Sequence, residues 1–325
     1  MIDLLKMGGI VSAIIILIRM KVPLSITLSG SSLILAWLFH MPLAALKNGI
    51  LKTIFSIENI YLILILELVL LFSAILKENG SMSRAIAALN RLFRDARITV
   101  ALIPSIIGLL PVVGGAMLSA PLVAEASDEL GLSPERRTFL NYWFRHIWEY
   151  TMPTFAAVFL TASIVGISIS DLVAANMPLT LAAILTGACF GFRGVRPLQS
   201  SEEPVKVNPW KDCLIFVRNL MPFFLVILLT LCFDLHLFYS LAVVTLGTVL
   251  LYQMPVYTLI QLGRRHLSID LAFLIWGMML FKEILLSSGA MVNVTSELTR
   301  VGMPPILLVV IVPAMIAFIT GYAPA

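Results

Sequence analysis

The sequence predicts an all-α integral membrane protein whose two halves form an inverted repeat, and three observations lead to this fold class. Sixty percent of the 325 residues are apolar and only 12% are charged, whereas an ordinary soluble domain is about half apolar and about one quarter charged. Apolar runs close to membrane-spanning length recur along the whole chain. Residues 57–116 also resemble residues 266–325.

The apolar runs predict the membrane helices, because a span needs about 20 mostly apolar residues. The expected helices are 4–18, 22–39, 60–76, 150–167, 178–192, 213–232, 236–253 and 269–286. Two further apolar segments, 98–124 and 304–325, contain prolines and require a separate interpretation. The polar stretch from Arg193 to Lys211 also contains prolines, which predicts an exposed linker. We therefore expect an N-terminal repeat at 1–209 and a C-terminal repeat at 210–325.

The internal similarity has a constant offset of 209 residues. Many of the matches are leucine or isoleucine, which are common in such a composition. Others are distinctive, namely Gly80 with Gly289, Met82 with Met291, Arg91 with Arg300, Pro104 with Pro313 and, further toward the N-terminus, Asp3 with Asp212. These matches favour a duplication. Chance similarity between two hydrophobic stretches is the alternative.

The number of crossings predicts that the second copy is inverted. If 98–124 enters the membrane and returns to the same side, an odd number of crossings remains in the first repeat. Loop 77–97 contains several basic residues, whereas the matching loop 287–302 contains only Arg300. Because basic loops stay in the cytoplasm, the two loops should face opposite sides. Inverted repeats are typical of secondary transporters.

The segment 98–124 predicts a re-entrant helical hairpin. It is apolar but contains Pro104, Pro111, Gly114, Gly115 and Pro121. Proline and paired glycines interrupt a helix, and a break at membrane depth occurs only where protein or water satisfies the backbone. Helix N-termini at such a break favour anions, and freed carbonyls with the Ser119 hydroxyl favour Na⁺. A kinked helix with glycines for close packing is the alternative.

The segment 304–325 predicts the second hairpin, with Thr320 and Gly321 in its break. The chain ends at Ala325, which aligns with Ala116. We therefore expect a second repeat that is truncated, because the sequence is either a fragment or a degenerate copy. The substrate and ion site would then include Pro111, Gly114, Gly115, Ser119, Thr320 and Gly321.

A polar and aromatic stretch at 136–153 follows the first hairpin. Arg145 and Glu149 have i,i+4 spacing and can pair on one helical face, with Asn141 and His146 nearby. These four residues are candidates for lining the transport path or coupling it to an ion. The alternative is an aromatic belt at the lipid headgroups with a neutralised ion pair.

Glu67 is a further candidate, because it lies within the apolar run 60–76. A carboxylate in hydrocarbon costs several kcal/mol unless it is protonated or partnered. A satisfied packing contact is the alternative. Residues 81–97 place Met82, Ile86, Leu89 and Phe93 on one face, which predicts an amphipathic helix on the bilayer surface.

Several functional classes have no support in the sequence. The three cysteines occur singly without zinc-binding spacing, and no nucleotide-binding, hydrolase or metalloprotease motif has a usable context. The basic residues lie mainly between apolar runs, so nucleic acid is not an expected partner. We expect no enzymatic activity and no bound cofactor.

Residues 108–153 resemble a prokaryotic family catalogued as domain of unknown function 401, which is grouped with the ion-transporter superfamily. The resemblance implies two inverted repeats with re-entrant hairpins, an elevator-like movement and a homodimer. It places Pro111, Gly114, Gly115, Ser119 and Pro121 at the first hairpin tip. The Ser-Asn-Thr tip motif of dicarboxylate carriers is absent from 109–121, which counts against a dicarboxylate substrate and a sodium site of that type.

These inferences predict a multi-pass protein of the prokaryotic cell membrane. The expected function is secondary active transport of a small anionic organic solute, driven by Na⁺ or H⁺, with the site between the two hairpins. The expected partners are the lipid bilayer, the solute and a second copy of the chain. The alternative function is a membrane scaffold or subunit whose hairpin only packs.

Overall fold

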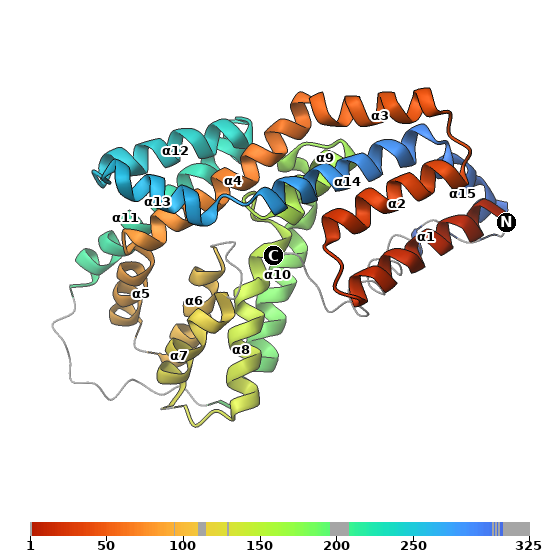
Figure 1. Cartoon of the computed structure of the whole chain (residues 1–325). Helices are drawn as coiled ribbons and strands as arrows, with labels where there is room; N and C mark the ends of the chain where they lie inside the picture. The colour runs from red at the N-terminus through yellow and green to blue at the C-terminus, as the bar shows by residue number, and fades with distance from the viewer. Residues whose placement is uncertain are drawn as a thin grey trace. The chain divides into compact units, whose positions relative to one another are not determined.

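The computed structural model describes residues 2–93, 95–109, 115–128, 130–195 and 208–300, together with 302, 304, 306 and 307. These residues form an all-helical protein, so the predicted fold class is confirmed at that level (Figure 1). The chain divides into two compact units. Unit 1 comprises residues 1–64 and 268–324, and unit 2 comprises residues 65–267.

The helices of unit 1 come from both ends of the chain. They are α1 (Ile2–Arg19), α2 (Leu24–Leu38), α3 (Leu43–Phe55), the first part of α4 (Ile57–Glu78), α14 (Ile269–Ser287) and α15 (Ala290–Arg300). Helix α14 packs against α2 and α3, while α1 packs against α2 and α15. The core contains Ile10, Leu35, Ala36, Leu280, Ile284 and Ala290.

Close backbone contact holds α2 against α14. A Cβ atom added to Gly277 would lie 2.9 Å from the carbonyl oxygen of Ser25, which is closer than real Cβ contacts allow. Small residues permit this approach, as is common between helices in membranes. At the other end of the unit, the Glu297 carboxylate accepts a 2.8 Å hydrogen bond from the backbone N–H of Leu4 and so caps α1.

The helices of unit 2 include the predicted hairpin and the segments that follow it. They are the rest of α4, then α5 (Ser81–Leu92), α6 (Ala96–Gly108), α7 (Gly115–Asp128), α8 (Pro134–His146), the 3₁₀ turn η1 (Ile147–Tyr150), α9 (Ala156–Val165), α10 (Ile169–Gly191), α11 (Pro209–Ile227), the π turn η2 (Leu228–Cys232), α12 (Leu237–Leu251) and α13 (Val256–His266).

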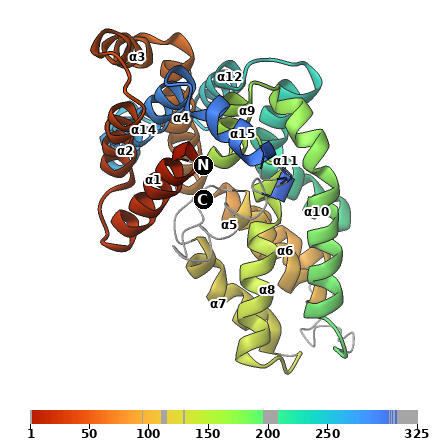
Figure 2. The same cartoon turned by 90° about the vertical axis from the view of Figure 1, so that its right-hand side faces the viewer.

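Two groups of contacts organise unit 2. Ala74 and Ile75 of α4 pack with Leu262 of α13, and Phe72 meets Phe223 of α11 edge to face at 5.2 Å between ring centroids. Helix α8 contacts α6, α7 and α10. It runs beside α10 in both Figure 1 and Figure 2.

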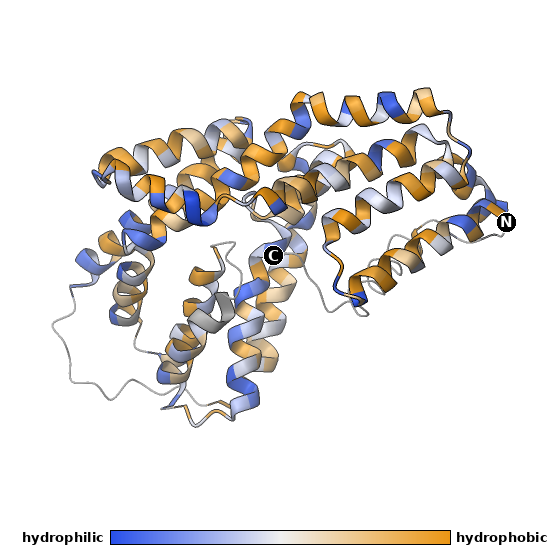
Figure 3. Cartoon of the chain, in the orientation of Figure 1, coloured by the Kyte–Doolittle hydropathy of each residue, from blue (hydrophilic) through white to orange (hydrophobic). Residues whose placement is uncertain are grey.

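Three of the described helices are long and apolar enough to cross a membrane, which indicates a membrane protein. They are α4, α10 and the continuous stretch Pro209–Cys232. The hydropathy colouring in Figure 3 shows α10 as more hydrophobic than its neighbour α8. Helices predicted at 22–39 and 236–253 are shorter, with 15 residues each in α2 and α12. At about 1.5 Å per residue, each is shorter than the hydrocarbon core of about 30 Å.

Several predicted helix boundaries were wrong. The helix expected at 150–167 is interrupted around Pro153, so that η1 ends at Tyr150 and α9 begins at Ala156. The helix expected at 178–192 begins at Ile169 and contains Pro178. Helices α3, α8, α13 and α15 were not predicted as separate elements, because their polar residues interrupt the apolar pattern.

The amphipathic helix predicted at 81–97 does not lie with its apolar face on a bilayer. Helix α5 ends at Leu92, and Asp95 begins a new helix. Met82, Ile86 and Leu89 are buried in the protein, where α5 packs along α11. Arg91 of α5 also donates a 2.8 Å hydrogen bond to Asp212 of α11, which is buried. Protein therefore covers the face that the sequence assigned to lipid.

We expect Gly277→Val to lower the thermal unfolding midpoint of the purified protein, because the added side chain would push α14 away from α2. Overpacking of a tight interface costs about 1–3 kcal/mol. Gly247→Val on α12 is the matched control, since nothing lies within 4 Å of a Cβ atom there. Equal midpoints for the two variants would contradict the packing of α2 on α14.

Candidate functional site

Helix α6, in the segment predicted to form the first hairpin, begins at a well-defined cap. The Asp95 side chain accepts a 3.0 Å hydrogen bond from the backbone N–H of Arg97, which satisfies one free donor of the first turn. The Arg97 guanidinium also donates to Asp95, at 2.7 Å to Oδ2. This side-chain hydrogen bond holds the pKa of the Asp95 carboxyl below its ordinary value. The cap fixes where α6 enters the unit.

Helices α6 and α7 pack against each other on either side of the predicted break. Helix α6 ends at Gly108 and α7 begins at Gly115. Pro111 and Gly114 lie outside the described residues, so the tip itself is not described. Pro104 and Pro121 lie inside the two helices rather than at breaks.

A buried hydrogen bond joins α7 to α8. The Ser119 hydroxyl donates to Oδ1 of Asn141 at 2.5 Å, and both side chains are buried, with 0% and 7% of their surface exposed. A second link, a 2.6 Å ion pair from Arg137 to Asp128, ties the start of α8 to the end of α7. Two residues selected separately from the sequence, Ser119 and Asn141, are therefore in direct contact.

Arg145 lies one turn beyond Asn141 on α8, where the backbone of α8 touches α6. A Cβ atom on Gly108 would overlap the carbonyl oxygen of Arg145. Only glycine therefore fits at the last position of α6. Only 2% of the Arg145 surface is exposed, and Arg145 is the largest of the fully buried side chains in the described residues. The Arg145 side chain is thus enclosed by protein, and its backbone carbonyl lies against the end of α6.

The other side of α8 packs against two glycines of α10. Cβ atoms on Gly187 and Gly191 would overlap the side chains of Trp143 and Leu140. The Trp143 indole also donates a 2.8 Å hydrogen bond to the carbonyl of Ala183. Glycines at i and i+4 let helices approach closely in a membrane, where small residues replace hydrophobic association as the basis of packing.

Contacts along α10 give the depth of Arg145. Leu140 meets Gly191, Trp143 bonds to Ala183, and Tyr150 accepts a 3.0 Å hydrogen bond from Asn176. Arg145 therefore lies between the levels of Ala183 and Asn176. That region is the middle of α10, which spans Ile169–Gly191.

Glu149 interacts electrostatically with Arg145, as the sequence predicts, and also with His146. Nε2 of His146 lies 3.8 Å from Oε1 of Glu149, an i,i+3 contact. The reason is the 3₁₀ turn η1, which has about three residues per turn instead of 3.6. His146 and Glu149 are both half-buried, on the turn after Arg145.

A mostly apolar cavity of about 290 Å³ lies beside the hairpin. Residues of α6, η1, α10 and α11 line it, including Ser105, Trp148 and Thr151. The Trp148 indole donates a 2.9 Å hydrogen bond to the carbonyl of Ser105 in α6. The Thr151 hydroxyl lies 3.0 Å from that of Thr180 in α10. The cavity thus has apolar walls with a few polar groups that are held in place.

The remaining predicted site residues lie elsewhere in the sequence. Glu67 is half-buried on α4, a different helix. Thr320 and Gly321 lie outside the described residues. Among the described residues, no group of three or more His, Cys, Asp or Glu side chains could hold a metal ion.

Sequence reasoning missed the glycines that position α8. Gly187 and Gly191 form a Gly-x-x-x-Gly pattern inside an apolar helix, which is a readable packing signal. Gly108 gave no such signal, because its partner is a backbone carbonyl 37 residues further along the chain. A hydroxyl and an amide are joined in the Ser119–Asn141 hydrogen bond, and the buried cation Arg145 lies one turn further along α8. Such a set can bind a carboxylate or another small anion.

We expect Gly108→Ala to destabilise unit 2, because the added methyl group would force the backbones of α6 and α8 apart. The expected cost in stability is about 1–3 kcal/mol. Each kcal/mol lowers the unfolding midpoint by about 2–4 °C in a chain of this size class. Differential scanning fluorimetry measures the midpoint. Gly30→Ala, where a Cβ atom meets nothing within 4 Å, should leave it unchanged. A tolerated Gly108→Ala would contradict the close contact.

Comparison with known proteins agrees with the resemblance in the sequence at the level of the family. No curated protein matches the chain. The family described as "Protein of unknown function (DUF401)" matches residues 4–325, which is nearly the whole chain. The chain therefore belongs to the DUF401 family.

Proposed function

We propose that this protein is a secondary transporter of a small anionic organic solute across the prokaryotic cell membrane, driven by Na⁺ or H⁺. The observation that carries the proposal is the buried Arg145 beside the break between α6 and α7. It lies level with the middle of α10, a helix long enough to cross the bilayer. The proposed solute site comprises the hairpin break with Ser119, Asn141 and Arg145.

The level of Arg145 along α10 favours a functional role over a position at the lipid headgroups. The aromatic-belt interpretation requires residues 142–150 to lie near headgroups, at the end of a span. Contacts with Ala183 and Asn176 instead place them along the middle of α10. A charged side chain at the bilayer centre is costly, and such residues generally face a protein interior or a water-filled path that uses them.

The groups near the break suit two kinds of ligand, an anion and a coupling cation. The N-terminus of α7 carries a partial positive charge and free N–H groups, which attract a carboxylate. Arg145 adds a full positive charge on the adjacent helix, and arginine matches carboxylate geometry with two parallel hydrogen bonds. The C-terminus of α6 presents carbonyls and partial negative charge, which suit a cation.

The two halves of the chain support the proposed duplication through their helices. Helix α4 ends at Glu78 and α14 ends at Ser287, and α5 begins at Ser81 while α15 begins at Ala290, so both pairs are separated by 209 residues. Between these helices, Gly80 and Gly289 both have a φ angle of 72°. This left-handed conformation favours glycine and makes the same turn in both copies.

Packing within each unit follows the same correspondence. In unit 1, α1 packs with α15, while α2 and α3 pack with α14. In unit 2, α11 packs with α5, and α12 and α13 pack with α4 through Val249 and Leu262. Unit 1 therefore combines α1, α2 and α3 of the first repeat with α14 and α15 of the second. Unit 2 likewise combines α11, α12 and α13 of the second repeat with most of α4 and with α5 of the first. Ile75 and Ile284, which correspond, are both 0% exposed.

A repeat of this kind, if inverted, provides two similar halves that can exchange conformations and open one site to either side. The inversion itself follows from loop charges, with loop 77–97 basic and loop 287–302 nearly free of basic residues. Proton coupling would use His146 and Glu149, which form a titratable pair on the turn after Arg145. Sodium coupling would use the carbonyls at the end of α6 instead.

The second candidate function is a membrane scaffold or subunit. The tight packing of α8 against α6 and α10 favours it, because such packing also stabilises a helix bundle without transport. The two functions differ in one respect. Burial of a charged side chain such as Arg145 is costly even where it is paired, which favours a function that uses the charge.

The first experiment is a thermal-shift screen of the purified full chain against carboxylates, sugar acids and oxyanions, with and without Na⁺. A ligand that binds the folded protein raises its stability by RT ln(1 + [L]/Kd). We expect one solute class to raise the midpoint, and Arg145→Gln to remove that shift and the uptake of the same solute into proteoliposomes. Loss of a charged hydrogen bond of about 1.5–3 kcal/mol weakens binding by about tenfold or more.

Arg19→Gln is the control, because Arg19 is exposed at the end of α1. This variant should keep both the shift and the uptake. A growing shift with added Na⁺ would identify sodium as the coupling ion. No shift with any solute, together with no uptake by the wild-type chain, would favour the scaffold.

Topology provides a separate test of the inverted repeat. We expect reporter enzymes fused within 77–97 and within 287–302 to report opposite compartments, because only the first loop is rich in basic residues. Activity of the cytoplasmic reporter at 77–97 and of the periplasmic reporter at 287–302 is the expected result. Both loops on one side of the membrane would contradict the inversion.

A further inference from the structure

A second cavity lies in unit 2, on elements that do not carry Ser119, Asn141 or Arg145. It has a volume of about 640 Å³. The last turn of α4, the start of α5, the N-terminal half of α11 and the junction between α12 and α13 line it. The residues are Glu78, Asn79, Arg84, Ile215, Arg218, Asn219, Tyr252, Met254, Pro255 and Thr258.

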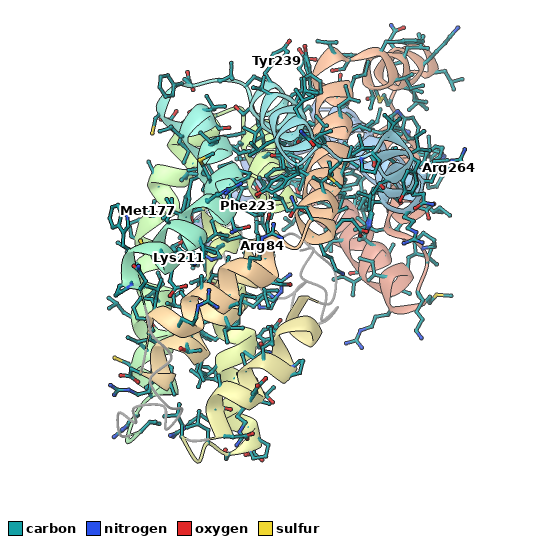
Figure 4. The ribbon with its side chains drawn as sticks, turned by 90° about the vertical axis from the view of Figure 1, so that its left-hand side faces the viewer. Arg84, Met177, Lys211, Phe223, Tyr239 and Arg264 are labelled. Carbon is teal, nitrogen blue, oxygen red and sulfur yellow. The ribbon has the colours of Figure 1, made fainter. Side chains whose placement is uncertain are left out.

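Arg84 is held in a fixed orientation at this cavity. Its Nε donates a 3.0 Å hydrogen bond to Oδ1 of Asn219. Its Nη1 donates a 2.7 Å hydrogen bond to the carbonyl of Asn79. Asn219 is itself anchored, because its Nδ2 donates to the carbonyl of Ile215 at 2.7 Å. Figure 4 shows Arg84 beside α11, the helix that also carries Lys211 and Phe223. Arginine fixed in this way loses little entropy when it binds a ligand.

Arg218 of α11 adds a second guanidinium to the lining of the cavity. It is exposed on α11, one position before the buried Asn219. Tyr252 and Thr258 contribute hydroxyl groups, and Ile215, Met254 and Pro255 form an apolar side. The charged lining groups are Arg84, Arg218 and Glu78, which leaves one net positive charge.

The corresponding place in unit 1 lacks this chemistry, a comparison that rests on the proposed duplication. With the offset of 209 residues, Arg84 corresponds to Asn293, Arg218 to Gly9 and Asn219 to Ile10. Ile10 is 2% exposed and packs in the core of unit 1, whereas Asn219 is 5% exposed. Since an apolar residue serves the packing at this position, the fold alone does not require the buried amide.

We propose that this cavity binds a phosphate-type anion. Two guanidinium groups with nearby hydroxyls match phosphate oxygens in geometry and charge. The cavity lies at the end of α4, a candidate membrane span, on the side that loop 77–97 assigns to the cytoplasm. One net positive charge and an apolar wall favour the headgroup of an anionic phospholipid, which carries a phosphodiester beside hydrocarbon. Free phosphate shares the same recognition chemistry.

The experiment measures the thermal unfolding midpoint of the full chain in two arms. In the first, vesicles of phosphatidylcholine are compared with vesicles that also contain phosphatidylglycerol. In the second, sodium phosphate replaces sodium chloride at equal ionic strength in phosphatidylcholine alone. Stabilisation by phosphatidylglycerol alone identifies a lipid headgroup, and stabilisation by inorganic phosphate identifies a free anion.

Arg218→Gln is the test variant, because Arg218 is exposed and its loss does not disturb the core. We expect it to weaken anion binding by about tenfold or more, as the loss of one charged hydrogen bond predicts. Arg264→Gln is the control, since Arg264 is an exposed arginine on α13 outside the cavity (Figure 4). It should bind like the wild type.

Asn219→Ile is a second variant, which places the residue of unit 1 in unit 2. It should fold and enter the membrane, because Ile10 packs at the corresponding position, and it should lose anion-dependent stabilisation because Arg84 loses its anchor. Two results would overturn the proposal. One is the absence of stabilisation in both arms, and the other is equal stabilisation in Arg218→Gln and Arg264→Gln.

Discussion

The close contact of α8 with two neighbouring helices is the constraint on which the candidate site depends. Helix α8 can touch α6 only because Gly108 has no side chain, and it can touch α10 only because Gly187 and Gly191 have none. These contacts enclose Arg145 and bring Asn141 to Ser119. In a membrane, lipid tails compete equally with apolar side chains, so close packing and hydrogen bonds determine which helices associate. Small residues therefore fix the position of the polar ones.

The all-helical architecture could be predicted from the sequence because it depends on local patterns, whereas the residues chosen for a site stay a prediction. The apolar runs identified most long helices, and the prolines and glycines of 98–124 located the break between α6 and α7. Ser119 was selected for its hydroxyl at the predicted break and Asn141 for its place near Arg145 and Glu149, and the two are hydrogen-bonded. Helix boundaries near proline were less predictable. Pro178 lies within α10 because a membrane helix can satisfy the freed backbone groups from its neighbours.

The rest of the site depends on which segments meet, and no local pattern contains that information. The 3₁₀ turn η1 brings Glu149 close to His146 as well, at i,i+3 spacing. The depth of Arg145 is evident only from its neighbours on α10. Likewise, the apolar face of α5 was assigned to lipid because its periodicity shows only that something apolar covers it. The covering element, α11, begins at Pro209, far along the chain.

The two units separate the residues that build the fold from those that carry chemistry. Positions that correspond at the offset of 209 residues and serve packing are alike, as with Ile75 and Ile284, both 0% exposed, and Gly80 and Gly289, both at a φ angle of 72°. Where corresponding positions differ in polarity, as with Asn219 and Ile10, packing of the fold alone does not require the polar residue. If the chain is a duplication, as proposed, each half serves as a control for the other, because a buried polar residue with an apolar counterpart has a cost that packing does not explain. The buried Asn219, whose counterpart Ile10 is apolar, meets this criterion and supports the proposed anion cavity.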